Sequence, residues 1–126
     1  MRFAPHGDDG ARATITLPAK FQGWAGIAHG GVVMTLLDEA MAHASGMTGE
    51  KGMTASVSVR FRHPVPLGVE LTLVGRVRGK RSRMLTLEAT VADAAGTVLA
   101  SSEGAFMTVG RVEKGKLGNL ASGESV

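Results

Sequence analysis

A long apolar stretch is the most prominent feature in the pattern of hydrophobic and polar positions. Apolar residues take nearly every position from Val32 to Ala44, directly after Gly30 and Gly31, and leave no broad polar face. A helix that is apolar on all sides is either buried or spans a membrane, and these 13 residues would rise only about 20 Å, too little for a bilayer. The pattern therefore predicts a core helix that starts near Gly30 and ends at Gly46, where a glycine can cap it.

Alternation of polar and apolar residues predicts strands on both sides of this helix. The predicted strands cover residues 12–17, 54–62, 69–77, 83–92 and 97–109, with turns at 79–82 and 93–96. The strand at 54–62 has one face with Ala55, Val57, Val59 and Phe61 and a polar face with Thr54, Ser56, Ser58, Arg60 and Arg62. Irregular structure is expected at 1–11, in a loop at 21–28 whose Phe21 and Trp24 plug the domain edge, and in a mobile connection at 47–52.

The order of these elements is one strand, the helix and then four strands in a meander. One apolar face per strand and one apolar helix predict an α+β domain, in which a single antiparallel sheet of five or six strands curls around the helix. The chain of 126 residues is expected to form one domain with its core at about 12–109. Residues 110–126 are dominated by Gly, Lys, Ser and Glu and are predicted to be a flexible tail.

Composition excludes several kinds of chemistry. The chain has no cysteine, hence no disulfide, no thiolate nucleophile and no cysteine-ligated metal. A metal is also not expected on histidines, because His29 and His43 lie fourteen residues, or about 21 Å, apart on one helix. The sequence shows no secretory signal and no apolar run long enough for a membrane span, so we expect a cytoplasmic protein. Only five aromatic residues are present, without a stacking motif, and nucleic acid is not an expected partner.

Positive charge is concentrated in one part of the chain. Between residues 60 and 83 the only acid is Glu70. The same span contains Arg60, Arg62, Arg76, Arg78, Lys80, Arg81 and Arg83. Such a cluster suits a partner that bears phosphate groups. The alternative is that these side chains only solvate strand faces and a hairpin turn.

The segment HGGVVMTLLDEAM, preceded by FQGWAGIA and followed by TASVSVRFRHPVPLG, resembles a known family. Over residues 12–109 the chain is similar to the hotdog-fold acyl-CoA thioesterases, of the phenylacetate-pathway and 4-hydroxybenzoyl-CoA type. The resemblance implies a sheet wrapped around the central helix and homodimers with sheets joined edge to edge, often paired into dimers of dimers. It also implies active sites at the dimer interface and no separate cofactor, because coenzyme A is part of the substrate.

Asp38 matches the catalytic acid of that family and would act as general base or nucleophile. Its neighbours one helical turn away, Met34 and Ala42, are apolar, and a poorly solvated carboxylate is a stronger base. Glu39 is the rival acid, but its corresponding neighbours are the polar Thr35 and His43, which suits a structural role. The alternative for Asp38 is a satisfied structural carboxylate.

The resemblance assigns further roles around this acid. Gly30 matches the oxyanion donor, and a backbone N–H at a helix N-terminus can stabilise negative charge there. His29 is expected to shape the turn through ring hydrogen bonds or to act directly, and Thr54 aligns with a residue that positions the attacking water from the partner subunit. The turn with Lys80, Arg81, Ser82 and Arg83 falls where relatives contact the nucleotide end of coenzyme A, and Phe61 is predicted to contact substrate.

Gly23 departs from the family pattern. Some relatives have an asparagine six residues before the histidine, whose side chain helps to hold the thioester carbonyl. Gln22, Trp24 or a backbone group would have to replace it here. We therefore expect an acyl-CoA thioesterase for small aromatic or medium-chain acyl groups. The alternative is a hotdog module that binds acyl-CoA without cleaving it, and a hotdog dehydratase is a weaker third interpretation.

Overall fold

The computed structural model describes residues 1–111 of the chain, so most of the predicted tail lies outside the described residues. One α-helix and eight strands follow one another along this part of the chain. Their bounds are β1 Ala4–Pro5, β2 Gly10–Thr16, the 3-10 turn η1 Ala19–Phe21, β3 Gln22–Trp24, β4 Ile27–Ala28, α1 Gly30–Met47, β5 Glu50–Phe61, β6 Glu70–Arg81, β7 Met84–Ala92 and β8 Val98–Arg111.

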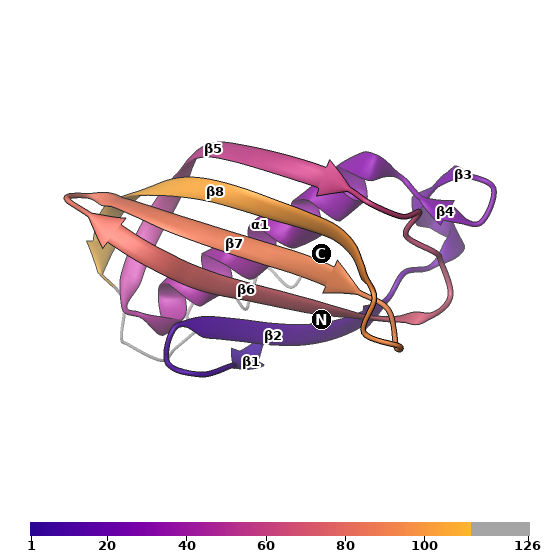
Figure 1. Cartoon of the computed structure of the whole chain (residues 1–126), viewed down its shortest axis with the longest axis horizontal. Coiled ribbons are helices and arrows are strands. Elements are labelled where there is room, and N and C mark those ends of the chain that lie inside the picture. The colour runs from indigo at the N-terminus through magenta and orange to yellow at the C-terminus, as the bar shows by residue number, and fades with distance from the viewer. Residues whose placement is uncertain (112–126) are drawn as a thin grey trace.

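A six-stranded antiparallel sheet curls around α1 (Figure 1). This arrangement confirms the predicted α+β class and the hotdog architecture. The strand order is β1-β2-β6-β7-β8-β5, so the expected meander holds for β6, β7 and β8 but is wrong for β5. Instead of pairing with β6, the strand after the helix crosses to the far edge and pairs with β8, because β2 already occupies the free side of β6.

The helix packs its buried face against the inner side of the sheet. The buried residues of α1 include Val33, Leu36, Leu37, Ala40, Met41 and Ala44. The helix and the sheet approach very closely at Gly75 in β6, where an added Cβ would overlap the carbonyl oxygen of Ala40. Glycine is therefore the only residue that lets the helix backbone reach the sheet at this point.

The helix is not buried on all sides, which corrects the expectation from its apolar sequence. Gly31, Met34 and Thr35 are exposed, and Asp38 and Ala42 are half-buried, so they form one open stripe along the helix. The curled sheet covers only part of the helix surface, and its edge strand β5 lies along one side of the uncovered stripe (Figure 1). Among the described residues, no helix has the length and the apolar character that a membrane crossing needs.

Several local predictions near the helix were wrong in detail. The helix runs to Met47, and the glycine with positive φ that follows it is Gly49 rather than Gly46. The expected mobile connection at 47–52 is in part the start of β5. The expected loop at 21–28 contains the two-stranded sheet β3–β4, and the indole of Trp24 is 76% exposed instead of plugging the domain edge.

The contact at Gly75 gives a test of the fold. We expect Gly75→Ala to lower the free energy of unfolding by about 2–3 kcal/mol, because a methyl group there forces the helix away from the sheet. Gly79→Ala, in the same strand with nothing within 4 Å of the added Cβ, should change it by less than about 0.5 kcal/mol. Urea unfolding followed by circular dichroism measures both, and equal values for the two variants would contradict this account of the helix–sheet contact.

Candidate active site

Asp38 and Thr54 meet on the open stripe of α1. The Thr54 hydroxyl donates a hydrogen bond to Oδ1 of Asp38 at 3.0 Å, between the middle of the helix and the edge strand β5. Asp38 is half-buried and Thr54 is exposed. This is a carboxylate in a partly desolvated position with a hydroxyl to orient it. The resemblance implies a threonine that acts from the partner subunit, whereas here both residues belong to one chain.

A bulge in β5 brings Thr54 to the helix side. Thr54 pairs with Phe106 and Ser56 pairs with Ala105, so Ala55 is an extra residue in β5. Opposite residues in an antiparallel pair point to the same face, and Phe106 is buried in the core. Thr54 therefore faces inward, which corrects its predicted place on the polar face of the strand.

Glu39, the rival acid, is engaged elsewhere. Its Oε2 lies 3.3 Å from Nε2 of His43 one turn along the helix. His43 is buried and stacks on Phe3, with ring centroids 4.3 Å apart. The pair ties the N-terminal segment to the helix, in line with the structural role expected for Glu39.

The N-terminus of α1 forms a second polar centre around His29. The imidazole Nδ1 accepts a hydrogen bond from the Gly31 N–H at 2.9 Å, which confirms that His29 shapes the turn through its ring. The N–H groups of Val32 and Val33 donate to the His29 carbonyl at 3.0 and 3.2 Å. Within the described residues, the N–H of Gly30 has no hydrogen-bond partner. This donor at the positive end of the helix is free to bind an anion or a polarised carbonyl.

An apolar cavity of about 370 Å³ opens beside Gly30. It is lined by Ile27, Ala28, Gly30, Val33, Phe61, Arg62, His63, Pro64 and Val65. Phe61 comes within 3.7 Å of the position that a Cβ on Gly30 would take. The two predicted site residues Gly30 and Phe61 therefore lie together. Arg62 and His63 were not predicted at this cavity, because they follow the end of β5, where strand periodicity gives no direction.

Gly23 packs against the backbone of His29. A Cβ on Gly23 would lie 2.8 Å from the Cα of His29, so an asparagine could not occupy this position without a backbone shift. The side chain of Gln22 is held in the β3–β4 hairpin, where its Oε1 accepts a hydrogen bond from the Gly26 N–H at 3.0 Å.

The predicted nucleotide contacts lie far from Gly30. The β6–β7 hairpin is at one end of the molecule and β3–β4, beside the start of α1, at the other (Figure 1). The turn consists of Ser82 and Arg83 rather than residues 79–82, because Arg81 pairs with Met84. Ser82 has a φ of 58°. Lys80, Arg81, Ser82 and Arg83 are all exposed.

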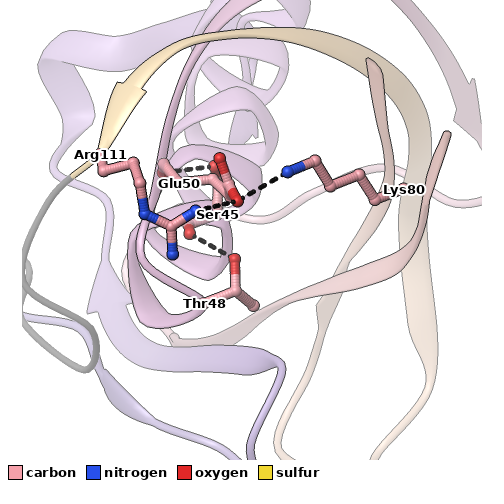
Figure 2. A network of polar contacts seen from close by, with 5 residues as sticks. All are labelled: Ser45, Thr48, Glu50, Lys80 and Arg111. Carbon is pink, nitrogen blue, oxygen red and sulfur yellow. Dashed lines mark hydrogen bonds and ion pairs between the residues drawn. The ribbon is translucent and has the colours of Figure 1, made fainter. Parts of the chain in front are cut away.

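Glu50 holds part of this basic hairpin. Its Oε2 accepts from Nζ of Lys80 at 2.9 Å and from Nη1 of Arg111 at 3.1 Å (Figure 2). At the same place, the hydroxyl of Ser45 donates to the Glu50 carbonyl at 2.8 Å. The hydrogen bond from Lys80, with the charges of Lys80 and Arg111, lowers the pKa of Glu50 although burial opposes this. Sequence reasoning missed this network, because its members are far apart in the chain.

Metal chemistry has no candidate site in the part of the chain that the structure describes. No three His, Asp or Glu side chains between residues 1 and 111 gather closely enough to hold an ion. The chemistry available at Asp38 and at Gly30 is instead that of a carboxylate, a hydroxyl and a backbone N–H.

The family can be assigned from a comparison with protein-family models. The model of the thioesterase superfamily matches residues 25–100, which include the helix, Asp38 and Thr54. The chain belongs to this superfamily. The enzyme class that the superfamily name denotes, a thioester hydrolase, is the class predicted from the sequence. A comparison with curated proteins gave no match.

Several solved structures share the fold of this chain. A thioesterase superfamily protein is 39% identical, with a TM-score of 0.77 over 79% of this chain and 49% of that chain, so the present chain spans about half its length. A Streptococcus mutans protein bound to acetyl CoA is 21% identical, with a TM-score of 0.82 over 89% of this chain and 90% of that one. The Escherichia coli PaaI protein from the phenylacetic acid degradation operon is 21% identical, with a TM-score of 0.80 over 87% and 80%.

The Glu50 network predicts a pH dependence of stability. A carboxylate whose pKa is lowered on folding stabilises the protein above its unfolded pKa, about 4.5, and this contribution is lost as the pH falls through the folded pKa. We therefore expect Glu50→Gln to be less stable than wild type at pH 7, and the difference to shrink as the pH falls below 4.5. Urea unfolding at several pH values measures this.

The control for that experiment is Glu70→Gln, which changes an exposed carboxylate. Its stability difference from wild type should be small at every pH. A Glu50→Gln difference that grew on acidification would contradict the assigned direction.

Proposed function

We propose that the protein is an acyl-CoA thioesterase in which Asp38 activates the attack on the thioester carbon. The observation that carries this proposal is the hydrogen bond from Thr54 to Asp38 at 3.0 Å on the open stripe of the helix. Carboxylates are rarely placed on an otherwise apolar helix face without a partner or a function. Here the partner is a single hydroxyl, which leaves the other carboxylate oxygen available for a reaction.

The reaction needs few groups. In the simplest form, Asp38 accepts a proton from water while the water oxygen bonds to the acyl carbon, and the carbonyl oxygen becomes an oxyanion. The carbon–sulfur bond then breaks, and the leaving thiolate takes up the proton that Asp38 accepted, which gives a carboxylic acid and free coenzyme A and restores the Asp38 carboxylate. A thiol has a pKa near 8.5 and is a good leaving group, so no strong acid is required. Direct attack by Asp38 is the alternative form.

Solved relatives support both the ligand and the pair of residues. A hypothetical thioesterase protein from Streptococcus pneumoniae, with a TM-score of 0.83, was solved with coenzyme A. It was also solved as single alanine variants of an aspartate and of a threonine that are numbered sixteen positions apart. Asp38 and Thr54 have the same separation.

The Gly30 N–H would bind the thioester oxygen of a substrate held by Asp38 of a second chain. Eight residues of helix separate Gly30 from Asp38, which is a rise of about 12 Å. One thioester carbonyl cannot be within hydrogen-bond distance of the first and within attack distance of the second. The two groups can act together only if two chains bring them to one place.

The surface around β5 supports such a homodimer. This strand forms one edge of the sheet and has hydrogen-bonding groups that a second β5 could pair with. Large apolar side chains are exposed on it and beside it, among them Met34, Met53 and Phe61. An exposed apolar edge of this kind is typical of a protein interface. A dimer of dimers would follow the family pattern.

The acyl group and the nucleotide of the substrate would bind at different ends of the molecule. The cavity beside Gly30 suits a small aromatic or medium-chain acyl group, because its lining is mostly apolar. Arg81 and Arg83 are exposed on the β6–β7 hairpin and suit the phosphates of coenzyme A, with Lys80 tied to Glu50. No cofactor is needed in this scheme.

A non-catalytic acyl-CoA-binding module is the second candidate. The observation that favours it is the packing of Gly23 against His29, which leaves no room for a side-chain amide near the Gly30 N–H. Tight binding of acyl-CoA without release of free thiol would identify this function.

Replacement of Asp38 tests the proposed reaction. We expect Asp38→Asn to lower kcat by about 10²–10⁴-fold, because the amide cannot accept the proton. Thr54→Val should have a smaller effect, since it only removes the orienting hydroxyl. The assay is thiol release from a panel of acyl-CoAs, with thermal unfolding to verify folding. Glu39→Gln is the matched control and should keep most of the activity, so equal losses for Asp38→Asn and Glu39→Gln would contradict the choice of acid.

Mixed dimers test whether two chains form one site. Gly30→Pro removes the N–H while proline suits the first position of a helix, and His29 before it has φ −61° and ψ 136°, which proline permits. Each variant alone should be inactive. A 1:1 mixture of Gly30→Pro and Asp38→Asn chains, unfolded and refolded together, should regain about a quarter of wild-type activity, because half of the dimers contain one intact site.

If both groups acted within one chain, the mixture would stay inactive. The mass of the wild-type protein in solution, measured by light scattering, provides an independent check. A strictly monomeric and fully active protein would contradict the dimer proposal.

A further inference from the structure

The imidazole of His29 packs against Gly31 at the start of α1, and the free N–H belongs to Gly30 between these two residues. We propose that the Nε2–H of His29 is the second hydrogen-bond donor to the thioester oxygen, next to the N–H of Gly30. This inference rests on the proposed thioesterase function and extends it by naming the donor atom and the tautomer that supplies it. Two converging donors are the usual arrangement for an oxyanion in acyl transfer.

The hydrogen bond at the other ring nitrogen fixes the tautomer. Nδ1 accepts from the Gly31 N–H at 2.9 Å, so this nitrogen uses its lone pair and bears no proton. The proton of the neutral ring is then on Nε2, which can only donate. His29 is exposed, and its Nε2–H is therefore available to a substrate.

Two glycines hold the imidazole in this position. A Cβ on Gly31 would lie 3.2 Å from Nδ1 and 3.3 Å from Cε1 of His29, so the ring lies directly against the Gly31 backbone. On the other side, Gly23 packs against the Cα of His29. The ring cannot rotate away without losing the hydrogen bond to Gly31. A donor that is held before the substrate arrives needs no reorganisation in the transition state.

The backbone N–H groups that follow Gly30 are already in use. The N–H groups of Gly31, Val32 and Val33 all bond to His29, through its ring or its carbonyl. The side chain of Gln22 is held in the β3–β4 hairpin by the hydrogen bond that its Oε1 accepts from the Gly26 N–H, and Arg62 and His63 line the cavity beside Gly30. Among these side-chain donors, His29 Nε2 is the one at the helix end itself, and the hydrogen bond at Nδ1 fixes the orientation of its ring.

Three substitutions separate this role from the capping of the helix. His29→Ser keeps a good N-cap acceptor for the Gly31 N–H, but its short side chain does not extend to the position of Nε2. His29→Ala removes both functions, and His29→Asn keeps a cap together with an amide donor. For each variant, kcat and KM with an acyl-CoA cleaved by the wild type, and the Tm, would be measured.

We expect kcat to fall about 100-fold in both the Ser and Ala variants with little change in KM, because an oxyanion donor acts mainly in the transition state. The Tm should fall only for His29→Ala. His29→Asn keeps the cap, but its amide nitrogen takes the position of Cδ2 and falls short of Nε2, so its kcat should lie between those of His29→Ser and the wild type. A wild-type kcat in His29→Ser would overturn the inference and leave only the cap. Absence of hydrolysis by the wild type would overturn the proposed function itself, so the two failures are distinguishable.

Discussion

The contact between Gly75 and the backbone of Ala40 is the constraint on which the arrangement of the site depends. At this point the sheet and the helix approach so closely that even a methyl group would overlap the Ala40 carbonyl oxygen. The sheet can curl tightly around α1 only because β6 has no side chain here. With the buried face fixed against β6 and β7, the opposite face of the helix must point away from the sheet. The position of Asp38 on the open stripe follows from this packing.

The reactive groups lie at two separate positions along α1. Its middle carries a carboxylate that a hydroxyl from β5 holds, and its N-terminus carries a free N–H and a capped histidine. The helix is continuous from Gly30 to Met47, so the distance between these places is fixed by its rise per residue. Near the C-terminal end of the helix, Ser45 donates a hydrogen bond to the Glu50 carbonyl, and the Glu50 carboxylate pairs with Lys80 and Arg111. Each group therefore has a set position before any ligand binds.

The overall architecture could be predicted from the sequence because it depends on periodicity. The apolar helix and the alternating strands are local patterns, and both appear in the structure close to the predicted residues. Asp38 and Gly30 could be placed on the helix for the same reason. The orientation of Thr54 could not be predicted, because one extra residue in β5 reverses the alternation and nothing in the sequence marks Ala55 as that residue. The Glu50 network depends on contacts between residues 30 and 61 positions apart, which no local pattern records.

The one large error about the helix has a physical meaning. An apolar residue in a sequence indicates that the side chain will be buried, but it does not indicate whether its own chain or a second chain covers it. Met34 on the helix and Phe61 on β5 have core-like side chains but are exposed in the single chain. Met53 is also exposed, but it lies on the outer face of the sheet, because the neighbouring Thr54 faces inward. Large apolar groups exposed on one face are typical of a protein interface. In the proposed homodimer, a second copy over the open stripe would cover Met34 and Phe61 and bring a second Gly30 within range of Asp38. The apolar residues of α1 that the sheet of its own chain leaves exposed would then lie in the interface between the two chains.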